Sequence, residues 1–149
     1  MEANHVRGMR EQRRDGSLRA GLALMAATVL PTGLWALASP RSFHNTFPLP
    51  GWRWVSTLGP FNEHLVRDYG AMSLALGALL ATAAVHLETR LVRTALVTWL
   101  VFAVPHLVFH LGQTEHFSHA QNAAQLAGLG AQVALPVLLL LLTRGRPGR

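Results

Sequence analysis

The stretch "LRAGLALMAATVLPTGLWALA", residues 18–38, has no charged residue after Arg19. It is long enough to cross a membrane, because a transmembrane helix needs about 20 mostly apolar residues. Three more apolar segments follow, at residues 61–85, 91–111 and 123–142. Backbone groups in hydrocarbon must form their hydrogen bonds internally, so we expect all four segments to be helices. The sequence therefore predicts an all-α, four-helix transmembrane bundle over residues 18–143, with a lipid bilayer as its surroundings.

The composition favours a membrane protein over a soluble one. Half of the 149 residues are hydrophobic and only 13% are charged, whereas about 25% of residues in soluble domains are charged. The chain has no cysteine, which excludes disulfides, thiolate metal ligands and thiol redox chemistry. The net charge of +6 comes from arginines that flank the apolar segments. Such flanking charges set membrane orientation, so we expect no nucleic-acid partner.

The arginines also predict the orientation of the bundle. Those on one side of the predicted spans are Arg7, Arg10, Arg13, Arg14, Arg19, Arg90, Arg93, Arg144, Arg146 and Arg149. The loop at residues 39–60 contains only Arg41 and Arg53, and residues 112–122 contain no arginine. By the positive-inside rule both termini are cytoplasmic, as in a multi-pass protein of the cell membrane. Residues 1–17 then form a basic, flexible cytoplasmic tail, and residues 144–149 form a second basic tail.

The first span has a second interpretation. A basic head, an apolar stretch and "ALAS" at residues 36–39 are also typical of a secretory signal peptide with its cleavage site. The apolar stretch is longer than the usual 7–15 residues of a signal peptide, which favours a helix that is retained.

Histidines and carboxylates gather on the outer side of this topology. His106 and His110 are four residues apart and therefore share one helix face, and His64 and Asp68 repeat this spacing on another span. Both pairs are expected near the outer ends of their helices. Imidazole and carboxylate groups bind transition metals. The sequence thus predicts an outward-facing pocket in which His64, Asp68, His106 and His110 bind a transition metal, a haem or a small ligand.

The last span supplies a predicted third wall of that pocket. Gln121, Gln125, Gly128 and Gln132 follow a single helical stripe, and polar groups in a span normally face the bundle interior. Gln121 and Gln125 are the predicted cofactor-binding residues. Small residues are expected to allow close helix approach at two places, Ser73 with Gly77 and Ala124 with Gly128.

Other functions fit the same residues. In a cofactor-free enzyme acting on a lipid-soluble substrate, Glu63, His64 and Asp68 would perform acid–base catalysis. In a structural subunit, as a homo-oligomer or with a membrane partner, the polar residues would only hold the bundle together. Glu63 and Arg67 are expected to form a structural ion pair. The aromatic residues of the 39–60 loop favour a belt at the lipid headgroups, with a lid over the pocket as the alternative.

The segment "GPFNEHLVRDYGA", residues 59–71, is the most specific part of a longer stretch, residues 33–77. This stretch resembles small four-helix membrane proteins of actinobacteria that are loosely similar to the DoxX-like class. The resemblance implies a four-helix membrane fold and covers about a third of the chain. Its motif residues are Asn62, Glu63, His64, Arg67 and Asp68. It implies no particular activity.

Overall fold

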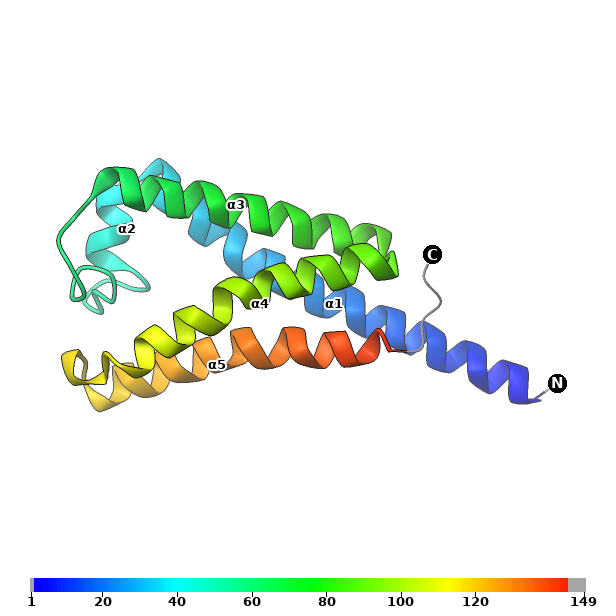
Figure 1. The fold of residues 1–149 in the computed structure, drawn as a ribbon. Coiled ribbons are helices and arrows are strands. Elements are labelled where there is room, and N and C mark those ends of the chain that lie inside the picture. The colour runs from blue at the N-terminus through cyan, green and yellow to red at the C-terminus, as the bar shows by residue number, and fades with distance from the viewer. Residues whose placement is uncertain (1, 145–149) are drawn as a thin grey trace.

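The chain forms four long helices and two short ones (Figure 1). The structure is a computed structural model that describes residues 2–144. The helices are α1 (Glu2–Ala38), α2 (Pro40–Thr46), α3 (Glu63–His86), α4 (Thr89–Leu111), the 3₁₀ helix η1 (Thr114–His116) and α5 (His119–Leu142). The helices α1, α3, α4 and α5 are each long and apolar enough to cross a membrane. The predicted all-α fold with four candidate spans is therefore confirmed, and the chain has the architecture of a multi-pass membrane protein.

Helix α1 begins much earlier than its apolar segment. Residues 2–17, predicted to be a flexible tail, continue the helix without a break to Ala38. At 1.5 Å per residue its 37 residues extend for about 55 Å, against a hydrocarbon core of about 30 Å. Figure 1 shows the start of α1 projecting beyond the ends of the other helices. Most of the second predicted tail, residues 145–149, lies outside the described residues.

Local sequence signals set the helix boundaries. Asn62 caps α3 by accepting a hydrogen bond from the amide of Leu65 at 3.1 Å. Ser118 and Gln121 form a capping box at the start of α5, in which each side chain accepts from the other residue's amide. Three prolines, Pro31, Pro105 and Pro136, stand inside helices and do not end them. Neighbouring helices can satisfy the carbonyls that such prolines leave free.

Helices α1 and α3 approach closely because their interface is built from small residues. A Cβ added to Gly70 would lie 2.6 Å from the backbone nitrogen of Leu37 and 2.8 Å from the carbonyl oxygen of Gly33. Ser73 and Gly77 continue this buried stripe, so the close approach predicted for them is confirmed. The same prediction for Ala124 and Gly128 is wrong, because a Cβ on Gly128 would meet nothing within 4 Å.

The helices form two pairs, α1 with α3 and α4 with α5. The pairs meet around one main cluster of buried side chains, which includes Leu18, Leu22, Val92, Leu96 and Leu139. Figure 1 shows α3 and α4 together at their short connection and wide apart at their other ends. There a smaller cluster, built on Ala36, Phe43 and Val66, joins α2 to α1 and α3. The bundle is thus packed tightly at the end near the termini and opens toward α2.

Arg93 ties α4 to the end of α5. Its Nε donates to the hydroxyl of Thr143 at 3.0 Å and its Nη2 donates to the carbonyl of Thr143 at 2.8 Å. Thr143 follows the last turn of α5 and is 1% exposed. A cation at a helix C-terminus also offsets the negative end of the helix dipole.

We expect Arg93→Ala to lower the free energy of unfolding by about 1–2 kcal/mol, because two hydrogen bonds and a favourable charge are lost. Arg93→Lys should recover only part of this, since an ammonium lacks the planar fork that reaches both oxygens. Thermal unfolding in detergent, followed by circular dichroism, measures both variants. Arg90→Ala is the control, because Arg90 is the neighbouring exposed arginine of the same helix; equal effects at Arg90 and Arg93 would contradict this role.

Candidate ligand-binding cavity

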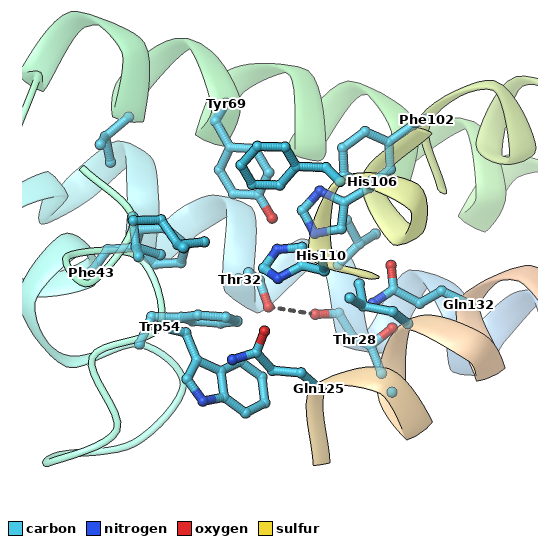
Figure 2. A pocket seen from close by; sticks show the side chains of 18 of the residues that line it. Thr28, Thr32, Phe43, Trp54, Tyr69, Phe102, His106, His110, Gln125 and Gln132 are labelled. Atoms are coloured by element: carbon cyan, nitrogen blue, oxygen red, sulfur yellow. Dashed lines mark hydrogen bonds between the residues drawn. The ribbon is translucent and has the colours of Figure 1, made fainter. Parts of the chain in front are cut away.

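A cavity of about 580 Å³ lies where the two helix pairs separate. Its lining comes from α1, α3, α4, α5, and α2 with the loop that follows it. Figure 2 shows side chains from these elements pointing into one space. The separation of α3 from α4 creates the space, and the aromatic side chains of the α2 segment close one end of it. Both interpretations of the loop aromatics, a belt at the headgroups and a lid, stay predictions, and Phe43, Phe47 and Trp54 line the cavity.

The walls of the cavity are largely aromatic. Lining residues come from the α2 segment (Phe43, Phe47 and Trp54), from α3 (Tyr69) and from α4 (Trp99, Phe102 and Phe109). The rings support one another: the centroids of Phe43 and Phe47 are 4.8 Å apart, and Phe43 stacks on Tyr69 at 5.7 Å. Such ring pairs add to the energy of area burial and hold the side chains in fixed orientations. The cavity is therefore bounded by preformed flat surfaces.

His106 and His110 form a row of adjacent rings with Phe102 on the cavity side of α4. His106 stacks on Phe102 with centroids 5.1 Å apart, and the centroids of His106 and His110 are 4.8 Å apart. Both histidines line the cavity, as the sequence predicted. Because their rings touch, a porphyrin cannot fit between them, so this pair does not supply ligands to both faces of a haem.

Some polar groups of the lining are already paired. The Thr32 hydroxyl donates to the carbonyl of Thr28 at 2.8 Å, the bond drawn in Figure 2. Trp99 donates through Nε1 to the carbonyl of Gln132 at 2.9 Å. This carbonyl lies four residues before Pro136, which has no N–H to offer it. The indole therefore takes the place of the missing helical donor.

Three buried polar atoms of the lining make no hydrogen bond within 3.5 Å: Nε1 of Trp54, Nδ1 of His110 and Nε2 of Gln125. They come from the loop after α2, from α4 and from α5. The imidazole of His110 and the side chain of Gln125 lie close enough to interact with each other. Gln125 is the most buried of the three residues, at 3% exposed. Most buried polar groups in folded proteins are paired, so three atoms without a hydrogen bond around a single cavity require an explanation.

The cavity carries no formal charge. Among the described residues, none of those that line it is Asp, Glu, Lys or Arg. The nearby arginines have other contacts: Arg41 lies over the ring of Phe61, 4.3 Å from its centroid, and Arg67 binds Glu63 and the carbonyl of Leu37.

The structure does not bring the four predicted metal ligands together. His64 and Asp68 do pair, with Nε2 and Oδ2 3.3 Å apart, but their side chains are 87% and 55% exposed and do not line the cavity. Within residues 2–144, no three His, Asp or Glu side chains lie close enough to hold a metal ion. The predicted convergence is therefore wrong.

The rotation of α3 explains the error. Its small-residue stripe faces α1, and Val66 and Gly70 belong to that buried face. His64 and Asp68 each precede one of these residues by two positions, which is about 200° around the helix. The tight α1–α3 contact therefore turns both side chains outward.

The two predicted glutamines behave differently. Gln125 lines the cavity with a free amide nitrogen, as described above. Gln121 is already engaged: Oε1 accepts from the amide of Ser118 in the capping box, and Nε2 donates to the carbonyl of Trp52 at 3.3 Å. Gln121 therefore holds the loop against α5 instead of facing the cavity. Gly128 and Gln132, the other members of the predicted stripe, do line it.

The acidic start of α3 has a structural role. Arg67 Nε donates to Oε1 of Glu63 at 2.9 Å, which confirms the predicted ion pair, and the same guanidinium donates to the carbonyl of Leu37 near the end of α1. An acid–base role for Glu63, His64 and Asp68 stays a prediction, with the three residues placed on the exposed first turns of α3 and not at the cavity.

Comparison of the chain with protein-family models, with curated proteins and with solved structures gave no match. The resemblance to four-helix proteins of the DoxX-like class therefore stays a prediction.

Proposed function

We propose that this protein is a multi-pass protein of the cell membrane that binds a small lipid-soluble molecule in the cavity between its two helix pairs. The observation that carries the proposal is the pair of buried donors without a partner, Nε1 of Trp54 and Nε2 of Gln125, both in residues that line one cavity. Leaving such a group unpaired costs about 1–3 kcal/mol. A bound molecule with suitable polar atoms would remove this cost.

The arginine distribution supports an orientation for the proposed membrane protein. Arg93, in the first turns of α4, contacts Thr143 at the end of α5, so two of the arginine-bearing regions meet at one end of the bundle. Arg41 and Arg53 belong to the α2 segment at the opposite, open end. With the arginine-rich end cytoplasmic, the cavity lies in the outer half of the bundle and both termini are inside the cell.

The core and the cavity both need α1, which supports an uncleaved first span. The buried residues Leu22, Met25, Ala26 and Val29 of α1 belong to the main core cluster, and Thr28 and Thr32 line the cavity. Removal of α1 as a signal peptide would take away one wall of the binding site, so the proposal includes α1 as a permanent span.

The proposal is tested by filling the cavity. Gly128 lines it and has open space at its Cβ position, whereas Gly130, which has the same open space, is not part of the lining. We expect Gly128→Leu to remain folded and to lose a small molecule that co-purifies with the wild type. Gly130→Leu should keep it. Mild-detergent purification, solvent extraction and mass spectrometry of the three proteins measure this.

Two results would contradict the proposal. One is equal recovery of every extracted species from Gly128→Leu and Gly130→Leu. The other is a stoichiometric transition metal in the wild type, lost on His106→Ala and on His110→Ala, since that would restore the metal hypothesis. Elemental analysis of the same samples detects it.

A further inference from the structure

We infer that the molecule bound in this cavity is an uncharged carbonyl compound with a flat, aromatic or conjugated body. This inference rests on the proposed function, because it assigns a chemical class to the ligand of the same cavity. Three properties of the lining carry it: the hydrogen-bonding character of its unpaired atoms, the absence of charge among its described residues and the aromatic walls.

The unpaired atoms call for a hydrogen-bond acceptor. The indole Nε1 of Trp54 can only donate, and the amide Nε2 of Gln125 can only donate. Nδ1 of His110 donates or accepts according to the tautomer. A hydrocarbon would leave the first two donors unpaired, and an ammonium group would present further donors to them. Figure 2 shows the amide of Gln125 between the ring of His110 and the indole of Trp54.

The absence of charged residues in the described lining favours an uncharged acceptor. A carboxylate or phosphate in the cavity would lose its hydration without meeting a cation, since the lining within residues 2–144 includes no lysine or arginine. Burying an unpaired charge costs far more than a hydrogen bond returns. A carbonyl oxygen accepts hydrogen bonds at a much smaller desolvation cost, and it can therefore pair with a buried donor such as Nε2 of Gln125 without bringing a charge into the cavity.

The aromatic walls of the cavity favour a ligand with a flat body. Tyr69 and Phe43 stack on one side, and on α4 His106 stacks on Phe102, with the tilted ring of His110 beside it. Flat rings pack on such surfaces in offset or edge-on arrangements that saturated chains cannot form. The cavity volume of about 580 Å³ is within the range of small-molecule sites.

Three probes with one common body separate these requirements. Benzophenone has two phenyl rings and a carbonyl, diphenylmethane lacks the acceptor, and diphenylacetate carries a carboxylate. Binding of each probe is measured to the full-length protein in lipid nanodiscs, for the wild type and for Gln125→Leu. The ratio of wild-type to variant affinity for one probe cancels the partition of that probe into lipid.

We expect Gln125→Leu to weaken benzophenone binding roughly threefold to tenfold, the loss of one hydrogen bond, and to leave diphenylmethane binding unchanged. Diphenylacetate should bind the wild type most weakly. Ultraviolet irradiation couples benzophenone to neighbouring residues, and mass spectrometry should find the adducts on cavity residues. Trp54→Phe removes the other donor and should give the same selective loss if Gln125→Leu does not fold.

The outcomes distinguish the two levels of the proposal. Equal effects of Gln125→Leu on benzophenone and on diphenylmethane, or tightest binding of diphenylacetate, would overturn the carbonyl assignment while the cavity remains a binding site. Failure of all three probes to bind, or benzophenone adducts that are equally abundant in Gly128→Leu and in the wild type, would overturn both the carbonyl assignment and the proposed function.

Discussion

Replacing Gly70 with leucine is expected to force α1 and α3 apart and to lower the free energy of unfolding by about 3 kcal/mol. The reason is that the atoms facing Gly70 belong to backbone: the nitrogen of Leu37 at 2.6 Å and the carbonyl oxygen of Gly33 at 2.8 Å from an added Cβ. A flexible side chain could rotate away, but these atoms move only with the whole helix. The measurement is thermal unfolding in detergent, with the yield of monodisperse protein as a second readout.

Gly130→Leu is the matched control for Gly70→Leu. Gly130 is also inside a long helix, but nothing lies within 4 Å of an added Cβ. Leucine has a better helix propensity than glycine by up to about 1 kcal/mol, so this variant should be at least as stable as the wild type. Equal melting temperatures for the two variants would show that α1 and α3 are not in this close contact.

Trp99→Ala is expected to lower the free energy of unfolding by about 3–5 kcal/mol, the usual cost of deleting a buried large aromatic side chain. Trp99 is 3% exposed, belongs to the main core cluster and holds the free carbonyl of Gln132. Trp99→Phe keeps an aromatic ring but removes the N–H donor and the atoms of the second ring. It should cost about 1–2 kcal/mol, because the carbonyl then has no partner in a segment that lacks water.

Pro136→Ala separates the loss of the Trp99 hydrogen bond from the loss of ring packing. Alanine at position 136 restores the backbone N–H that a helix normally directs to the residue 132 carbonyl. The cost of Trp99→Phe should therefore be smaller by about 1 kcal/mol in the Pro136→Ala background than in the wild type. Unfolding of the four proteins forms a double-mutant cycle, and strictly additive effects would contradict the proposed replacement of one donor by the other.

The aromatic cavity and the tight glycine interface have one structural cause. Small residues bring α1 and α3 into backbone contact, whereas α4 carries bulky residues such as Trp99 and Phe102 that line the cavity. The result is two close pairs with a space between them, not four equally spaced helices. The loop after α2 fills the mouth of that space, and Gln121 fastens it to α5 through the carbonyl of Trp52.

The number and positions of the spans were readable from the sequence because they depend on local properties. Apolar runs of about 20 residues must be helical in a bilayer, and the structure has long helices at all four predicted places. The i, i+4 pairs formed for the same reason: His106 with His110, His64 with Asp68 and Glu63 with Arg67 each need only one helix to bring them together.

Which of these pairs share a site was decided by the tertiary structure alone. The sequence shows that His64 and Asp68 are neighbours on a helix, but their direction depends on how α3 is rotated against α1, and the contact between Gly70 and Gly33 sets that rotation. In the same way, Trp54 and Gln125 are 71 positions apart in the sequence, and only the folding of the α2 segment over the open end brings an indole and an amide to one cavity. Periodicity along one helix determines which side chains share a face, whereas packing between helices determines what that face meets.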